Sequence, residues 1–144
     1  MATGKCMCGA VTLTLRAVPA DYGTCHCEMC RRWTGSALLG VTVQQDDVTV
    51  GGADNVRTIQ SSDWAERAWC DRCGSGLWYR VTAAGPHFGA YEIPIGLLDD
   101  ANGMQMTREI FIDDKPDAFT FAGDREVLTR AEVLALYGAP SQGA

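Results

Sequence analysis

The sequence predicts a single domain of mainly β structure. Its 144 residues are the length of one ordinary domain, and 47% of them are hydrophobic, which is enough to build a core. Apolar segments of strand length alternate with breaks that are rich in glycine, proline and aspartate. We therefore expect one domain over residues 1–138, followed by a flexible tail over residues 139–144.

The strands can be taken in order along the chain. In residues 11–16, Val11, Leu13 and Leu15 alternate with polar residues and so share one face, which is the pattern of a half-buried strand. Further segments with strand signals are 37–43, 48–50, 56–61, 67–70, 77–82, 87–95 and 105–112. Pro94 cannot donate a backbone hydrogen bond to a sheet, so we expect it at an edge, a bulge or a strand end.

Two helices complete the expected elements. A short one should run from about Glu28 to Trp33 and carry Cys30 away from the cysteines that precede it. A carboxy-terminal one should begin at Thr129, because Thr129 and a glutamate three residues later match the capping box. An apolar stripe follows, and Gly138 is placed to end this helix.

The charge balance excludes some classes of partner. Twelve basic residues stand against 18 acidic ones, which gives a net charge of −6 and an isoelectric point near 4.7. Nucleic acid and anionic membrane surfaces are therefore disfavoured. No segment is long and apolar enough for a membrane span, and the amino terminus lacks the pattern of a secretory signal. We accordingly expect a cytoplasmic protein.

The seven cysteines fall into three tight groups. These are a C-x-C pair, a C-x-C-x-x-C triplet and a C-x-x-C pair, made up of Cys6 and Cys8, of Cys25, Cys27 and Cys30, and of Cys70 and Cys73. Cysteines two or three residues apart can converge on one metal ion, with zinc preferred and tetrahedral iron second. Buried apolar cysteines or redox-active dithiols are the alternatives, but three groups that use every cysteine favour a metal.

Seven ligands suggest a division into four and three. A closed structural zinc site takes four ligands, whereas three ligands and an open position are typical of a catalytic or substrate-binding zinc. The triplet brings three thiolates by itself, so the two pairs can combine into the closed site, although spacing alone leaves this pairing open. In extended backbone His26 points away from Cys25 and Cys27, which favours an outer hydrogen-bonding role or simple exposure.

Other residues near the triplet are candidates for contact with a substrate. Arg31 and Arg32 follow the triplet directly and could pair with the carboxylates of a ligand, or could only compensate the charge of the thiolates. Lys115 could act in the same way, although a turn role suits its Asp-Asp-Lys-Pro context better. Of the four tryptophans, Trp33 is the most favoured for a pocket because it lies next to the triplet.

The motifs around these cysteines resemble those of a known family. Residues 4–11 (GKCMCGAV), 25–35 (CHCEMCRRWTG) and 70–77 (CDRCGSGL) are similar in order, spacing and flanking glycines to the glutathione-dependent formaldehyde-activating enzymes, whose module is also called the CENP-V/GFA domain. The resemblance continues to about residue 121. It implies an Mss4-like fold of coiled antiparallel β-sheets with two zinc ions. The structural zinc would be held by Cys6, Cys8, Cys70 and Cys73, and a second, exchangeable zinc by Cys25, Cys27 and Cys30.

The resemblance also implies a reaction. The founding activity of the family joins formaldehyde to glutathione and gives S-hydroxymethylglutathione, a carbon-sulfur lyase type of step. The expected partners are thus a small thiol such as glutathione and an aldehyde. Where many members carry a histidine before the apolar run that leads to the Asp-Lys segment, this chain has Arg108 and Glu109. The alternative function is a non-catalytic, zinc-stabilised scaffold for protein interaction.

Overall fold

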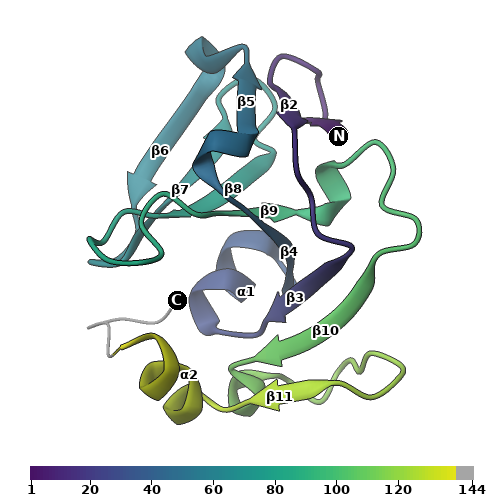
Figure 1. The fold of residues 1–144 in the computed structure, drawn as a ribbon, viewed down its shortest axis with the longest axis vertical. Coiled ribbons are helices and arrows are strands. Elements are labelled where there is room, and N and C mark those ends of the chain that lie inside the picture. The colour runs from purple at the N-terminus through teal and green to yellow at the C-terminus, as the bar shows by residue number, and fades with distance from the viewer. Residues whose placement is uncertain (139–144) are drawn as a thin grey trace.

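Eleven strands and two α-helices make up the computed structural model, which describes residues 1–138 (Figure 1). The strands form a three-stranded sheet and an eight-stranded sheet. The prediction of a mainly β fold is confirmed, and the fold implied by the resemblance is compatible with this arrangement. The tail expected over residues 139–144 lies outside the described residues.

The three-stranded sheet has the order β1-β2-β5 and is antiparallel throughout. Its strands are β1 (Ala2–Lys5), β2 (Thr12–Leu15) and β5 (Val48–Gly51). The alternation in residues 11–16 holds, because Val11, Leu13 and Leu15 are all buried. They pack with Val41 and Ile93 of the large sheet in the main core of the molecule.

The eight-stranded sheet has the order β11-β10-β3-β4-β9-β8-β7-β6. Its strands are β3 (Asp21–Cys25), β4 (Leu38–Val43), β6 (Val56–Gln60), β7 (Ala65–Cys70), β8 (Gly76–Val81), β9 (Tyr91–Pro94), β10 (Gln105–Ile110) and β11 (Glu126–Leu128). All neighbours are antiparallel except that β10 runs parallel to both β3 and β11, so the sheet is mixed. Pro94 is the last residue of β9, as expected of a residue that lacks a backbone donor.

The two α-helices begin and end where the capping signals place them. Helix α1 (Glu28–Thr34) has Cys27 at its N-cap and ends at Gly35, whose φ of 82° is left-handed. Helix α2 (Arg130–Tyr137) has Thr129 at its N-cap with a complete capping box. Four short 3₁₀ helices connect strands, namely η1 (Gln45–Asp47), η2 (Ala53–Asn55), η3 (Ile95–Leu97) and η4 (Ile112–Asp114).

Three strands were not expected from the sequence, namely β1, β3 and β11. The strand expected over residues 87–95 begins only at Tyr91, because residues 83–89 form a turn, and the strand expected over 105–112 ends at Ile110. Among residues 1–138 there is no helix with the length and apolar character that crossing a membrane requires.

Figure 1 shows how these elements surround the middle of the large sheet. Helix α1 packs against β4, and α2 packs against β11 and η4. The cysteine triplet extends from the end of β3 into the first turn of α1, and its cysteines form a second core cluster with Leu38, Phe111 and Val133. The centre of the sheet, α1 and α2 therefore enclose the region where the chemistry-bearing residues gather.

Candidate metal centres and adjoining cavities

The first cluster of cysteines joins the two sheets. Cys6 and Cys8 lie between β1 and β2, whereas Cys70 and Cys73 lie at the connection between β7 and β8. All four sulfur atoms lie within 4.8 Å of one another. The Sγ atoms of Cys6 and Cys8 are 3.6 Å apart, and those of Cys8 and Cys70 are 3.9 Å apart. Four sulfurs at the Zn–S distance of about 2.3 Å in a tetrahedron would be about 3.8 Å apart, so this cluster could hold a zinc ion.

Two tight turns give the first cluster its shape. The backbone N–H of Gly9 donates to the carbonyl of Cys6, and that of Gly74 donates to the carbonyl of Cys70. Both glycines have a left-handed φ near 80°, a conformation that favours glycine. The N–H of Val11 donates to Cys6 Sγ at 3.3 Å, and the Ser75 hydroxyl lies 3.2 Å from Cys73 Sγ. Hydrogen bonds with Ser75 lower the pKa of Cys73 to about 5.

The second cluster lies at the junction of β3 and α1. The sulfur atoms of Cys25, Cys27 and Cys30 lie within 4.8 Å of one another, and all three residues are buried. The backbone N–H of Cys30 donates to Cys27 Sγ at 3.3 Å, so the N-cap of α1 is itself a sulfur atom. Hydrogen bonds from Cys25 and Cys30 lower the pKa of Cys27 to about 3, which favours a thiolate here. This cluster could also hold a metal ion, with one coordination position left open.

A buried arginine balances the charge of the second cluster. Arg67 projects from β7, is only 3% exposed, and donates from Nη2 to Cys30 Sγ at 3.5 Å. Its guanidinium lies over the rings of Trp33 and Tyr79, at 5.0 and 5.2 Å from their centroids. An arginine stays charged in a protein, so this contact stabilises the anionic form of the sulfur that it touches. The donor set is thus that of a thiolate metal site.

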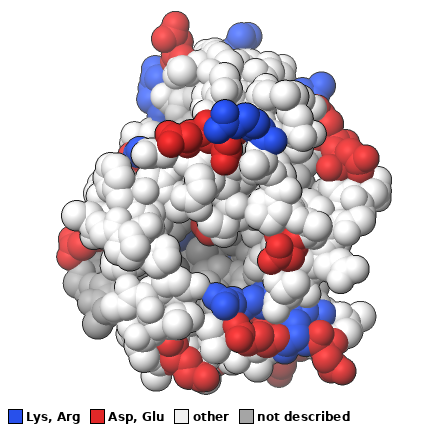
Figure 2. All heavy atoms as spheres, viewed as in Figure 1, with Lys and Arg blue, Asp and Glu red and all other residues white. Residues whose placement is uncertain are grey.

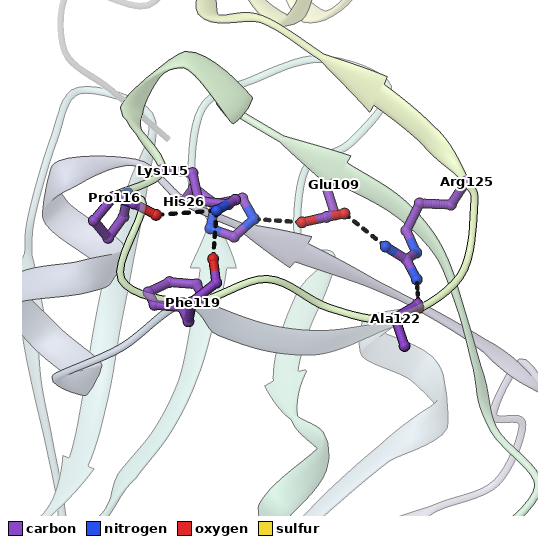
Figure 3. Close-up of polar contacts among 7 residues, drawn as sticks. All are labelled: His26, Glu109, Lys115, Pro116, Phe119, Ala122 and Arg125. Carbon is purple, nitrogen blue, oxygen red and sulfur yellow. Dashed lines mark hydrogen bonds and ion pairs between the residues drawn. The ribbon is translucent and has the colours of Figure 1, made fainter.

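His26 is turned away from the sulfurs and belongs to a buried polar network. Its Nε2 lies 2.7 Å from Glu109 Oε1, and Arg125 Nη1 donates to Glu109 Oε2 at 2.7 Å (Figure 3). Burial opposes ionisation of Glu109, but the hydrogen bonds from His26 and Arg125 outweigh it and hold the carboxyl pKa below its ordinary value. The outer hydrogen-bonding role expected for His26 is what its geometry shows. Because β3 pairs with β10, Glu109 fixes the strand that carries Cys25.

The segment after η4 covers this network. Lys115 Nζ donates to the carbonyl oxygens of Pro116 and Phe119, so it stabilises a turn, as its sequence context favours (Figure 3). The rings of Phe119 and Phe121 lie 5.8 and 6.2 Å from the His26 ring. Lys115 is therefore committed to its own segment and does not face either cysteine cluster.

A cavity of about 330 Å³ opens on one side of the second cluster, and Cys25 and Cys30 line it. Its floor is the face of the large sheet around Gly23 and Gly40, which are paired across β3 and β4 and leave no side chain there. Helix α2 closes it from the other side through Val133 and neighbouring residues. Figure 2 shows a hollow in this face of the molecule, with mostly uncharged atoms around it and charged side chains along one rim.

One carboxyl group reaches into this cavity. Glu92 of β9 accepts a hydrogen bond from Thr42 Oγ1 at 2.6 Å and forms no ion pair with any residue of the described range 1–138. Burial raises the pKa of Glu92 to about 7, and the hydrogen bond from Thr42 offsets this only in part. The neighbouring Tyr79 hydroxyl also has a raised pKa, chiefly because it is buried.

A second cavity opens on the other side of the cluster, where Cys27 lines it. Its walls are different in character, because three arginines and one glutamate contribute to them, namely Arg32, Arg67, Arg130 and Glu28. Arg32 is largely exposed and pairs with Glu28 at 3.5 Å, and Arg130 pairs with Asp114 at 2.6 Å. The cysteine triplet thus forms part of the wall between an apolar cavity and a cationic one.

The residues expected to contact a substrate separate in the structure. Arg32 and Trp33 line the cationic cavity, whereas Arg31 lines neither of the two cavities. Sequence reasoning missed Arg67, Glu92 and the pairing of Glu109 with His26. No local motif marks these residues, because strand pairing between distant segments brings them to the cluster.

Comparison with known proteins adds a family to this geometry. Residues 1–114 match the family model of the glutathione-dependent formaldehyde-activating enzymes. A protein of Schizosaccharomyces pombe described as an uncharacterized lyase is 32% identical over 132 residues, which cover 91% of this chain and 93% of the relative. A protein of Halomonas elongata, provisionally named as a glutathione-dependent formaldehyde-activating enzyme, is 30% identical over 52% of this chain and 53% of its own.

Proposed function

The chain belongs to the glutathione-dependent formaldehyde-activating enzyme family, and on that premise we propose that it joins or cleaves a small thiol and an aldehyde beside the cysteine triplet. The thiol is of the glutathione kind, and the aldehyde is formaldehyde or a close relative. The observation that carries the proposal is the position of Cys25, Cys27 and Cys30, which face a cavity on each side.

We further propose that both cysteine clusters bind zinc. Cys6, Cys8, Cys70 and Cys73 would hold a structural ion, and Cys25, Cys27 and Cys30 a second, exchangeable one. A zinc ion with an open position supplies a Lewis acid that lowers the pKa of an incoming thiol and so makes it a nucleophile at neutral pH. The hydrogen bond from Arg67 to Cys30 and the sulfur spacing in the first cluster support thiolate ligation.

The two cavities suggest where each reactant lies. Glutathione carries two carboxylates, and the cavity beside Cys27 offers the guanidinium groups of Arg32 and Arg130. The cavity beside Cys25 and Cys30 is mostly apolar and suits a small uncharged aldehyde. Arg67 lines the cavity beside Cys27 and is in contact with Cys30, so its charge serves that cavity as well as the cluster.

Cobalt substitution tests the thiol step directly. Tetrahedral cobalt-thiolate sites have visible spectra that change when a further sulfur enters. We expect two cobalt ions per chain and a change confined to about one of them on addition of glutathione. Cys27→Ser should abolish this spectral change. Cys70→Ser, which alters the other cluster, should not remove the response to glutathione selectively. Two bound ions that ignore glutathione would favour the non-catalytic scaffold instead.

Catalysis is tested by exchange spectroscopy with ¹³C-labelled formaldehyde. The rate of exchange between formaldehyde and its glutathione adduct should rise in proportion to the zinc-loaded protein. Protein with Cys27→Ser should leave the spontaneous rate unchanged.

A further inference from the structure

Glu92 stands out among the groups that line the apolar cavity. The other titratable or charged side chains that face this cavity come from β3, α1, β8, the turn before β9, β10 and α2, and they are Cys25, Cys30, Tyr79, His87, Arg108 and Tyr137. Arg108 pairs with Glu126 and donates to the hydroxyl of Tyr137. Among the lining residues within the described range 1–138, Glu92 is the one that carries a carboxyl group.

The strand register aims this carboxyl along the sheet. Thr42 is paired with Glu92 across β4 and β9, and Tyr79 is paired with Glu92 on the other side across β8 and β9. Oε1 is held by the Thr42 hydroxyl at 2.6 Å. Oε2 leans over the next cavity-facing position of β4, Gly40, where a Cβ atom would lie only 3.4 Å from it.

That direction leads toward the cysteine triplet. Along β4 the cavity-facing positions after Thr42 are Gly40 and then Leu38, and Leu38 is paired with Cys25. Gly40 in turn is paired with Gly23, so neither of these two positions places a side chain on the sheet between the free oxygen of Glu92 and Cys25. The open floor of the cavity is therefore a path from a carboxyl oxygen to a sulfur of the candidate metal centre.

We propose that Glu92 is the catalytic residue that carries the proton between the thiol and the carbonyl oxygen of the aldehyde in this cavity. This inference rests on the proposed function. When the C–S bond forms, the carbonyl π bond breaks and its electron pair moves onto the oxygen, which becomes an alkoxide. The proton that the thiol gives up must reach that oxygen to leave the neutral hydroxymethyl thioether. The Glu92 carboxylate accepts this proton from the thiol, and the resulting carboxylic acid donates it to the alkoxide oxygen. In the cleavage direction, the carboxylate takes the proton from the hydroxyl group and the acid returns it to the sulfur.

The environment of Glu92 suits both roles at neutral pH. Burial raises its pKa to about 7, so both protonation states are populated there. Thr42 holds one oxygen and leaves the other free to exchange a proton with a ligand in the cavity. Water that enters the cavity can extend its reach to the reacting atoms.

The first test is Glu92→Gln, which keeps the shape and removes the proton. We expect kcat/KM for the glutathione-formaldehyde reaction to fall by about 100-fold or more. The glutathione-induced change in the cobalt spectrum should persist, because the cysteine triplet is intact. Glu66→Gln on β7 is the matched control, since Glu66 pairs with Arg80 away from the cavity, and it should keep the wild-type rate.

The second test separates proton transfer from a structural role. Infrared difference spectra of the protein should show a carboxylic acid band that is lost as pH rises through about 7 and is missing in Glu92→Gln. Thr42→Val removes the hydrogen bond that lowers the pKa of Glu92, so both this band and the pH dependence of kcat/KM should move to higher pH.

The outcomes distinguish the two proposals. If Glu92→Gln keeps the wild-type rate and pH profile while the wild-type enzyme is active, the assignment of Glu92 is wrong and the proposed function stands. If no carboxyl titrates near neutral pH, the assignment is likewise wrong. If the cobalt-substituted wild-type protein ignores glutathione and no exchange is accelerated, the proposed function itself fails.

Discussion

The buried carboxylate between His26 and Arg125 allows a quantitative test of what supports the cysteine triplet. Glu109 accepts hydrogen bonds at 2.7 Å from both residues, and the side chains of all three are less than 10% exposed. Glu109→Gln keeps the volume of the side chain but replaces one accepting oxygen with an NH₂ group. That group can bond His26 only if the ring carries its proton on Nδ1, and in either case Arg125 loses the carboxylate charge with which it pairs.

The expected cost follows from these contacts. A hydrogen bond to a charged group contributes about 1.5–3 kcal/mol, and removal of one partner from a buried ion pair costs about 3–5 kcal/mol. Glutamine retains one accepting oxygen, so we expect the lower end of that range, about 3 kcal/mol of unfolding free energy. Glu126→Gln is the matched control. Glu126 pairs with Arg108 at 2.7 Å but its side chain is 53% exposed, so its loss should cost under about 1 kcal/mol.

The measurement is urea unfolding at a fixed concentration of free zinc, because a bound metal adds to the apparent stability. Glu109 has a lowered pKa in the folded protein, so its contribution is present above the ordinary glutamate pKa of about 4.3 and is lost as pH falls through the folded value. The difference between wild type and Glu109→Gln should therefore shrink below about pH 4. Equal losses for Glu109→Gln and Glu126→Gln at pH 7 would refute the reasoning.

Three further predictions concern other parts of the molecule. Cys70→Ser should lower the midpoint of thermal unfolding more than Cys27→Ser. The reason is that a metal at the first cluster closes a long loop between the sheets, whereas a metal at the triplet closes a short one. Circular dichroism of the zinc-loaded variants measures the two midpoints. Gly52→Ala should destabilise the protein more than Gly103→Ala. Both glycines have a left-handed φ, but a Cβ atom at Gly52 would overlap a backbone carbonyl, whereas one at Gly103 meets nothing within 4 Å. The midpoints of denaturant unfolding compare the stabilities of the two variants. Because Glu92 has a raised pKa, its charge costs stability as pH rises from about 4.3 to about 7, so Glu92→Gln should gain stability relative to wild type over that interval.

Local patterns predicted the elements whose signals are local. The alternation in residues 11–16 and the capping box at Thr129 both describe interactions within a few residues, and the structure confirms them. Strand β1 has no alternation and contains Gly4, where a Cβ atom would lie 2.5 Å from the carbonyl oxygen of Leu97. In the sequence this glycine indicates the end of a strand, whereas in the structure it allows the backbone of another segment to approach β1 closely.

The remaining strands are defined by their partners. Strand β3 contains aspartate, glycine and threonine, and it is a strand because β4 and β10 pair with it on both sides. The parallel pairing of β10 with β3 joins segments about 80 residues apart, which no sequence period reports. The same holds for the cavity, whose floor exists because Gly23 and Gly40 are paired, and for Glu92, which reaches it through the register of β9.

The charges around the triplet explain why its two cavities differ. With the proposed zinc ion bound, three thiolates and the ion would carry a charge of −1, and the buried guanidinium of Arg67 would bring the sum to zero. An incoming thiolate therefore adds a charge with no partner inside the cluster, and burying it is costly unless a cation lies near. On the side of Cys27 lie the guanidinium groups of Arg32, Arg67 and Arg130, although Glu28 and Asp114 offset part of the charge of Arg32 and Arg130. On the opposite side of the triplet, an ionised carboxylate would repel the same thiolate. The raised pKa of Glu92 avoids this repulsion, because the protonated carboxyl group carries no charge. The protonated group also holds the proton that the new alkoxide requires.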